Sequence, residues 1–300
     1  MTEDSPKAAK PGDPDGSASF GALYDRAVES LLSVPVSDTW IDSASGRTHL
    51  LTAGDPSAQP VIVFQGGNVT NPVTLCWIQT LADDYYLIAP DTPGQPGKTT
   101  VEIASDFGLW VVEVLDGLGL DNVAMLGISH GGGIVLEAAV EAPARIDAAA
   151  LIAPAGFGTS LSLDLVRIVL LSLGYRFLPR QQLLQRALAP MFTQSISTVD
   201  ETIIETVGTA LRTEDLRAEF PGPADPESLA GFEAPTLVIT AEQDPFFPGR
   251  RTCKRAARHL PSLEECVMLT EERHFLSPAG QHRASERIQT FLGEHTGVTQ

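Results

Sequence analysis

Short apolar runs alternate with longer amphipathic segments along most of this chain, and the alternation predicts the order of its secondary structure. Seven runs of four or five mostly apolar residues are typical of strands buried on both faces of a parallel sheet. They are Thr48–Thr52, Val61–Phe64, Tyr86–Ala89, Val123–Gly127, Ala149–Ala153, Thr236–Thr240 and Glu265–Leu269. Helical periodicity occupies the intervals, at Phe20–Leu32, Thr74–Leu81, Ile103–Leu118, Gly131–Ala142, Gly249–His259 and Ser277–Leu292. The pattern predicts an α/β fold, with a mostly parallel open sheet and helices on both of its faces.

The alternation stops between residues 158 and 231, where only helical patterns occur. These patterns cover Leu161–Leu178, Gln181–Leu188 and Thr198–Leu211. We expect them to form a helical cap, inserted over the edge of the sheet where the strands end; the alternative is a run of packing helices without substrate contact. The predicted organisation is a flexible tail over 1–18, a core over 19–157 and 232–300, and the cap over 158–231.

A glycine-flanked serine follows one of the buried strands directly. Gly127-Ile128-Ser129-His130-Gly131 lies between the apolar run at 123–127 and the helical pattern that follows it. A GxSxG motif between a strand and a helix is typical of a nucleophile elbow, in which glycines leave room for a tight turn that projects the serine hydroxyl. The motif alone is a weak signal, but its position makes Ser129 the candidate nucleophile.

A serine nucleophile needs a base and an acid that orients the base, and both are expected in loops that follow strands. Asp244 follows the run at 236–240, and His274 follows the run at 265–269, so the chain order is Ser, Asp, His. Glu242 is the rival acid. His282 and His295 are the rival bases, although both fall in or beyond a predicted helix.

The same chemistry requires hydrogen-bond donors for an oxyanion. We expect one from the backbone N–H of His130, the residue after the candidate nucleophile. The second is expected from Gly67, which follows the early strand in Gln65-Gly66-Gly67-Asn68. Gln65 and Asn68 are the candidate substrate-binding residues beside it. The alternative is that Gly66-Gly67 forms only a flexible turn.

With these residues in place, the sequence resembles the α/β-hydrolase superfamily, within its branch of capped, esterase-like serine hydrolases. The resemblance runs from about Trp40 to Leu292. It includes Ser45-Gly46-Arg47-Thr48-His49, Ala53-Gly54-Asp55-Pro56, Asp91-Thr92-Pro93-Gly94-Gln95-Pro96-Gly97-Lys98 and Trp110–Leu120. Two positions depart from the usual pattern: Gln65 replaces a histidine before the oxyanion glycine, and Arg273 replaces a glycine before the catalytic histidine.

The resemblance implies hydrolysis of a small or medium-sized apolar carboxylic ester through an acyl-enzyme. Lactonase, thioesterase, perhydrolase and C–C hydrolase chemistry use the same fold and triad, so they stay open. A non-catalytic receptor with this fold is the rival from another class, because Gln65 departs from the pattern.

Composition limits the partners. The chain has 38 acidic and 20 basic side chains, for a formal net charge of −18. This excess disfavours nucleic acid and anionic membranes, so we expect a small-molecule substrate, with the chain a monomer or homodimer. Neither a metal nor another cofactor is expected, because no ligand cluster occurs. The N-terminus lacks an apolar signal region, which favours a cytoplasmic location. Cys76, Cys253 and Cys266 are expected to be small buried apolar residues.

Overall fold

The structure is a computed structural model that describes residues 14–99, 101, 106–213, 222 and 224–296. Its centre is an eight-stranded sheet in the order β1-β2-β4-β3-β5-β6-β7-β8. The first two pairings, β1 with β2 and β2 with β4, are antiparallel, and all the others are parallel. The strands are β1 (Val36–Ser43), β2 (Gly46–Ala53), β3 (Gln59–Phe64), β4 (Tyr85–Pro90), β5 (Val123–Ile128), β6 (Ile146–Ile152), β7 (Thr236–Ala241) and β8 (Leu263–Leu269).

All seven predicted strands are present, with bounds within two residues of those expected except for β6, which begins three residues earlier, at Ile146. β1 is a further strand that the apolar pattern does not predict. Most of its side chains are exposed, because it lies at the edge of the sheet and pairs only with β2. An edge strand of this kind has no continuous apolar run, so the periodicity of its sequence carries little signal.

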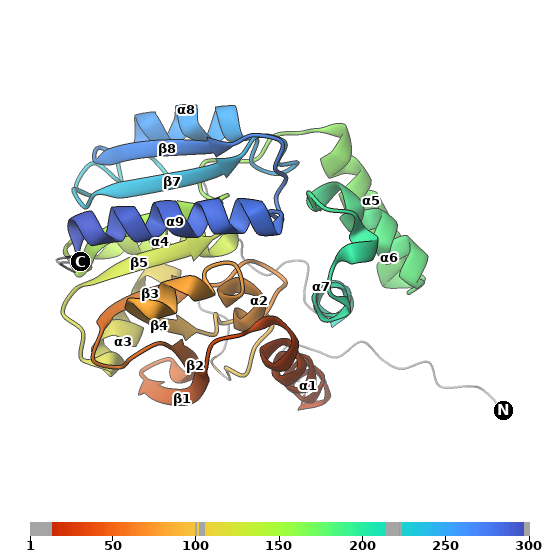
Figure 1. Cartoon of the computed structure of the whole chain (residues 1–300), viewed down its shortest axis with the longest axis horizontal. Coiled ribbons are helices and arrows are strands. Elements are labelled where there is room, and N and C mark those ends of the chain that lie inside the picture. The colour runs from red at the N-terminus through yellow and green to blue at the C-terminus, as the bar shows by residue number, and fades with distance from the viewer. Residues whose placement is uncertain (1–13, 100, 102–105, 214–221, 223, 297–300) are drawn as a thin grey trace.

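The core helices cover both faces of the sheet (Figure 1). Along β3, Val61 and Val63 pack into one apolar cluster with α9, whereas Ile62 and Phe64 pack into a second cluster with α3 and α4. This is the alternation expected of a strand buried on both faces. The core helices are α1 (Pro14–Leu31), α2 (Asn71–Leu75), α3 (Phe107–Leu118), α4 (His130–Glu141), α8 (Gly249–His259) and α9 (Pro278–His295).

Three sequence-based boundaries need correction. Helix α1 begins at Pro14, so residues 14–18 are helical and do not belong to a tail, while residues 1–13 lie outside the described part of the chain. The helix expected over Thr74–Leu81 is instead the short α2 followed by the 3₁₀ helix η1 (Gln79–Asp83). Helix α3 begins at Phe107 after an Asp106 N-cap, and most of the expected first turn from Ile103 lies outside the described residues.

Helices α5 (Leu163–Phe177), α6 (Gln181–Leu188) and α7 (Glu201–Thr213) follow β6, with the short 3₁₀ helices η3 (Ala189–Met191) and η4 (Ile196–Thr198) between α6 and α7. They stand beyond the arrowheads of β7 and β8, to one side of the sheet (Figure 1). Over the described residues, no helix is long and apolar enough to cross a membrane.

Two of the three cysteines form a disulfide, which corrects the expectation that all three are simple apolar residues. Cys253 on α8 is bonded to Cys266 on β8, with their Cα atoms 5.7 Å apart. Cys76 is a free thiol of intermediate burial. Sequence spacing gave no hint of this pairing, because the two residues meet only when α8 packs back against β8.

Candidate active site

Ser129 occupies a strained turn between β5 and α4. Its backbone has φ 53° and ψ −112°, a conformation that residues other than glycine rarely adopt. The flanking glycines permit the turn: a Cβ on Gly127 would lie 2.4 Å from the Gly131 carbonyl oxygen, and one on Gly131 would lie 2.1 Å from the Phe64 carbonyl oxygen. The local sequence therefore folds as the elbow that the GxSxG motif predicts.

Asp244 and His274 come together because β7 and β8 are paired in register up to their last residues, Ala241 and Leu269. The loops that follow the two strands then leave the same edge of the sheet. Nδ1 of His274 lies 2.6 Å from a carboxylate oxygen of Asp244, and Nε2 lies 2.9 Å from Oγ of Ser129. All three expected residues thus form one hydrogen-bonded chain.

The Asp244 carboxylate is fully buried and held in a single orientation. Its second oxygen accepts hydrogen bonds from the backbone N–H groups of Phe246 (2.8 Å) and Phe247 (3.0 Å). A carboxylate only accepts, so Nδ1 of a neutral His274 carries the proton, and Nε2 is left to accept from the Ser129 hydroxyl. A hydroxyl bonded in this way to an oriented imidazole is the arrangement that makes serine a nucleophile.

The rival acid and bases lie elsewhere. The Glu242 carboxylate is 3.6 Å from Arg250, and His282 is 3.4 Å from Glu286 on the same helix. His295 is 2.8 Å from Glu264, at the other end of β8. Among the described residues, no three His, Cys, Asp or Glu side chains are placed to hold a metal ion.

The loop after β3 lies beside Ser129, because Phe64 pairs with Gly127 in the parallel β3–β5 ladder. The backbone N–H of Gly66 donates to Thr74 Oγ1, and that of Asn68 donates to Gln95 Oε1. Across the described chain, no hydrogen-bond acceptor is found for the N–H of Gly67, which lies between them and lines the same cavity as Ser129. Asn68, with φ 60°, also lines this cavity.

His130 is the first residue of α4, so its backbone N–H lies at the positive end of that helix. Its ring is buried edge-on against Phe107, with 5.5 Å between ring centroids. The ring of His130 therefore points away from the site, and it is the backbone N–H of this residue that lies next to Ser129.

Gln65 does not fulfil its expected role as a substrate-binding side chain. It is fully buried, and it is not among the residues that line the cavity. Its amide nitrogen donates to the carbonyl oxygens of Val69 (2.6 Å) and Pro96 (3.0 Å), and its amide oxygen accepts from Thr92 N–H (3.1 Å). Gln65 thus links the loop after β3, which contains Gly67, to the loop after β4. Its buried hydrogen bonds hold the backbone around Gly67 in place.

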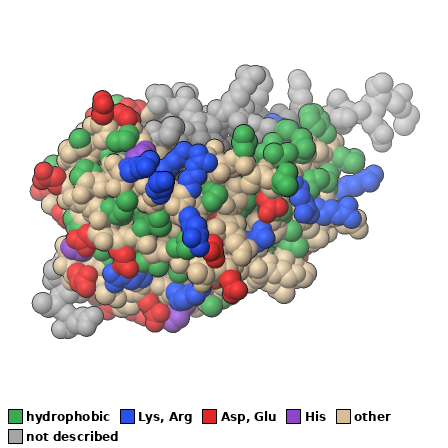
Figure 2. Space-filling view, turned by 90° about the horizontal axis from the view of Figure 1, so that it is seen from above, with side chains coloured by type: hydrophobic (Ala, Val, Ile, Leu, Met, Phe, Trp, Pro, Cys, Tyr) green, Lys and Arg blue, Asp and Glu red, His purple; other side chains and the backbone are tan. Residues whose placement is uncertain are grey.

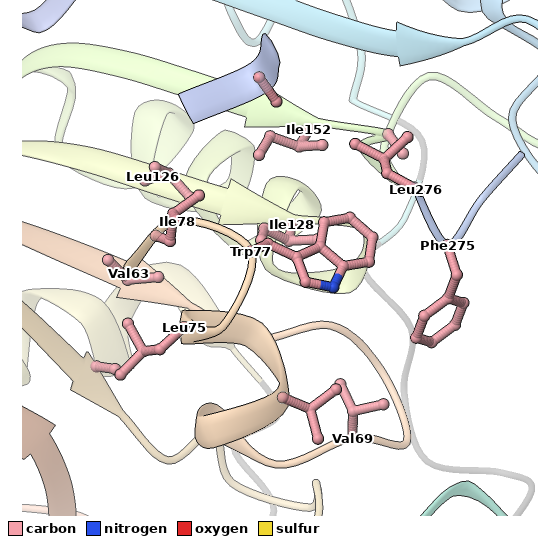
Figure 3. Packing of buried hydrophobic residues seen from close by; sticks show 14 of the residues in the cluster. Val63, Val69, Leu75, Trp77, Ile78, Leu126, Ile128, Ile152, Phe275 and Leu276 are labelled. Carbon is pink, nitrogen blue, oxygen red and sulfur yellow. The ribbon is translucent and has the colours of Figure 1, made fainter. Parts of the chain in front are cut away.

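Two adjoining apolar cavities lie near Ser129, and the first of them is lined by Ser129 itself. The first, of about 130 Å³, is bounded by Ser129 and His274 together with Val69, Trp77 and Ile128. In Figure 3, Trp77 lies beside Ile128 and faces Phe275, whose ring centroid is 5.8 Å away. The second, of about 340 Å³, is lined mainly by residues of α5, α6 and α7. Both cavities share Gly67, Asn68, Met191, Phe246 and Phe275.

The loop that carries His274 is hydrogen-bonded on both sides of the histidine to the segment that follows α6. Arg273 N–H donates to Thr193 Oγ1 (2.8 Å), and the Arg273 guanidinium donates to the carbonyl oxygen of Pro190 (2.8 Å). Phe275 N–H donates to the carbonyl oxygen of Met191 (2.8 Å). Arg273, the departure from the usual glycine, therefore connects the His274 loop to the segment that follows α6.

Sequence reasoning missed the apolar residues that line the site. Phe246 and Phe247 come two and three residues after Asp244, and Phe275 comes directly after His274. Their rings surround the His274 imidazole at centroid distances of 4.9, 5.8 and 6.0 Å. Their adjacency to the expected triad is the one signal that could have identified them. Nothing in the sequence marks Trp77 or Met191, which only the fold brings to the cavity.

Comparison with known proteins agrees with this geometry. The alpha/beta hydrolase fold family matches residues 59–181. The uncharacterized carboxylesterase Nap of Bacillus subtilis is 25% identical over 297 residues, which covers 95% of this chain and 96% of the relative. Carboxylesterase YbfK of the same bacterium is 22% identical and covers 91% and 93% of the two chains. The crystal structure of naproxen esterase from Bacillus subtilis aligns with a TM-score of 0.80 at 21% identity, over 93% of this chain and 98% of that one. The chain is therefore an enzyme of the α/β-hydrolase fold that resembles bacterial carboxylesterases.

Proposed function

We propose that the protein is a serine carboxylesterase that forms an acyl-enzyme on Ser129. The main support for this proposal is the hydrogen-bonded chain that runs from Ser129 Oγ through both nitrogens of His274 to the buried Asp244. The names of the two relatives that align over nearly the whole chain, both carboxylesterases, support the same reaction.

In the first half of the reaction, Ser129 Oγ attacks the ester carbonyl carbon while His274 Nε2 takes the hydroxyl proton. The resulting imidazolium is stabilised by Asp244, whose other oxygen is held by two backbone N–H groups. His274 then gives the proton to the leaving alkoxide, and the alcohol departs. In the second half, His274 takes a proton from water, the hydroxide attacks the acyl-enzyme, and the proton returns to Ser129.

The negative charge that develops on the carbonyl oxygen needs fixed donors. We assign them to the backbone N–H groups of Gly67 and His130. The open N–H of Gly67 supports the first assignment, since the N–H groups on both sides of it are already bonded within the protein. The position of His130 at the start of α4, next to Ser129, supports the second.

The shape and lining of the two cavities favour a small or medium-sized apolar ester. The larger cavity alone, of about 340 Å³, lies within the ~300–1,000 Å³ typical of small-molecule sites. The smaller cavity beside Ser129 is suited to the smaller of the two groups joined by the ester, and the larger one under the cap to the bulkier group. Their lining is mostly aromatic and aliphatic, and the guanidinium of Arg176, which also lines the larger cavity, donates to the carbonyl oxygen of Leu211. We therefore infer that neither group carries a charge.

The test is the hydrolysis of p-nitrophenyl acetate and butyrate by the protein and by Ser129→Ala. We expect hydrolysis by the wild type and at least a ~10³-fold loss of kcat in the variant, since a triad without its nucleophile keeps little of its catalysis. Ser57→Ala is the matched control, because Ser57 is exposed in the turn between β2 and β3, where it bonds to Asp55 and lines neither cavity. A Ser129→Ala protein that is folded and fully active would contradict the proposal.

The bond that is cleaved is decided by a panel of matched substrates. Esters, lactones, thioesters and C–C hydrolase substrates with similar apolar groups would be compared by kcat/KM. The proposal predicts the highest value for an ester. A substrate of another class with a higher kcat/KM, also lost in Ser129→Ala, would keep the mechanism and change the substrate class.

A further inference from the structure

Helix α5 of the cap exposes a long apolar face. Leu163, Val166, Leu170, Leu173 and Phe177 recur at intervals of three and four residues, so they lie along one side of the helix. Leu163 is 91% exposed, Leu170 62% and Phe177 84%, and the other two are also exposed. Leu161 and Leu178 extend the exposed apolar surface at the two ends of the helix. We call these seven residues the α5 outer face.

The opposite side of the same helix is apolar too, and it is buried. Ile168 is 6% exposed and Tyr175 8%, and both pack within the protein. Ile168 and Ser172 line the larger cavity that leads to Ser129. A helix that is apolar all round is normally buried all round. Most of the α5 outer face thus lacks a covering partner in this chain's described residues. Leu173, at its margin, also lines the larger cavity, so the face borders the substrate cavity.

Positive charge accompanies this face in an otherwise acidic protein. Arg167 on α5, Arg180 directly after Pro179 and Arg186 on α6 are all exposed. Asp164 is the one acidic residue between 161 and 199, and it lies 3.4 Å from Arg273. Figure 2 shows hydrophobic side chains gathered at the cap end of the molecule, with Lys or Arg side chains beside them. By contrast, residues 1–157 carry 20 acidic and 6 basic side chains.

We propose that the α5 outer face docks the enzyme on an anionic lipid surface, with the cap toward the lipid and the acidic core toward water. Leucine and phenylalanine side chains enter the region between headgroups and acyl chains, while the arginines meet the negative headgroups. Most of the acidic charge lies in the core, so screening at physiological salt, over about 8 Å, keeps its repulsion weak. The proposal departs from the sequence-based expectation that the chain has no membrane partner.

A second copy of the chain fits this face less well. In a two-fold dimer the same patch meets itself, so the arginines that flank the α5 outer face would be brought close to one another. Among the described residues, no acidic side chain at this face is placed to neutralise them, since Asp164 is paired with Arg273. A negatively charged surface neutralises all of them together, which is why the charge pattern favours lipid.

Docking on lipid would also determine how the substrate reaches Ser129. This part of the proposal, unlike the binding itself, rests on the proposed esterase function. An apolar ester partitions into the lipid, where its local concentration rises. The cavity wall formed by α5 would then lie against that reservoir. Apolar esters presented in anionic vesicles should be hydrolysed faster than the same esters in neutral vesicles, while water-soluble esters should show no such difference.

The test is co-sedimentation of the full chain carrying Ser129→Ala with vesicles, so that binding is measured without turnover. The vesicles are phosphatidylcholine alone, or phosphatidylcholine with phosphatidylglycerol in equal parts. The proposal predicts binding to the mixed vesicles, and at least about tenfold weaker binding to the neutral ones. The triple variant Leu163→Ser, Leu170→Ser, Phe177→Ser should lose binding by at least about tenfold, and so should Arg167→Gln with Arg180→Gln.

The matched control is Leu109→Ser with Val140→Ser, which removes two exposed apolar residues from α3 and α4. It should bind the mixed vesicles like the parent. Absence of binding by the parent, or equal loss in the control, would overturn the proposal. A dimeric parent that binds no vesicles, together with a monomeric triple variant, would also overturn it. In that case a second copy of the chain, and not lipid, would cover the α5 outer face. In chains that keep Ser129, all of these surface variants should hydrolyse p-nitrophenyl acetate at the wild-type rate. This result separates the docking test from the test of the triad.

Discussion

The side-chain oxygen of Gln95 accepts a hydrogen bond from the backbone N–H of Asn68 at 2.8 Å. This contact connects the loop after β4 to the loop that carries Gly67, at the residue next to the proposed oxyanion donor. Gln65 makes the second connection between the same two loops. The donor is thus fixed before substrate binds, as electrostatic stabilisation of a transition state requires.

We predict that Gln95→Ala lowers kcat for p-nitrophenyl butyrate by about tenfold with little change in KM. Loss of an oxyanion donor outright costs about 10²–10³, and the variant would displace the donor without removing it. Gln289→Ala is the control, since Gln289 bonds to Asp84 at the other end of the molecule. Steady-state kinetics of the two variants provide the measurement, and an unchanged kcat in Gln95→Ala would remove the positioning role.

Gln65→Leu should destabilise the fold as well as the site. The substitution leaves the carbonyl oxygens of Val69 and Pro96 and the N–H of Thr92 without their buried partner. Unsatisfied buried groups of this kind lead us to expect a loss of roughly 2–4 kcal/mol in the free energy of unfolding. Urea denaturation measures it directly. A variant as stable as the wild type would show that these contacts are not maintained in solution.

The sequence predicted most of the fold and the triad because both leave local signals. Buried parallel strands appear as apolar runs, and Ser129, Asp244 and His274 each follow such a run. The role of Gln65 was missed, since a glutamine beside a glycine-rich loop looks the same whether it faces substrate or braces the backbone. The outward direction of Leu163 and Leu170 was also hidden, because periodicity shows that a helix has an apolar face but not what covers it.

The Cys253–Cys266 disulfide should contribute measurable stability. It closes a loop with a sequence separation of 13 residues, for which chain entropy predicts about 3 kcal/mol. Cys253→Ser with Cys266→Ser should lower the free energy of unfolding by about that amount, and reduction of the wild type should have the same effect. Urea unfolding with and without reductant provides the comparison.

Cys76 serves as the internal control for that experiment. Burial, with a contribution from Asp200, raises the pKa of the Cys76 thiol to about 12. It should therefore alkylate slowly in the folded protein at neutral pH, and Cys76→Ser should not alter the response to reductant. If the wild type alkylates at three cysteines in denaturant without reductant, the disulfide is absent.

Glu272 should make the protein sensitive to acid. Burial alone would raise the pKa of this carboxyl, but hydrogen bonds from Ser277 and Thr193 and the charge of Arg283 outweigh it and hold the pKa below its ordinary 4.5. Because the folded pKa is the lower one, the ionised group stabilises the fold above the unfolded pKa. That stabilisation is lost as the pH falls from about 5 through the folded value.

The matched variant is Glu272→Gln, which keeps the shape of the side chain and removes the charge. We expect it to be less stable than the wild type at pH 7 and to lose less stability between pH 5 and pH 3. Urea unfolding across this range gives both quantities. Parallel stability curves for the two proteins would show that Glu272 does not contribute to the acid response.

Labelling with a fluorophosphonate, followed by peptide mass spectrometry to locate the adduct, tests whether Ser129 is the nucleophile. We expect one adduct per chain, on Ser129, and no adduct in Ser129→Ala. We also expect slow labelling in His274→Ala, where the base is missing. An adduct on another residue, or an active enzyme that the reagent neither labels nor inhibits, would contradict the assignment of Ser129.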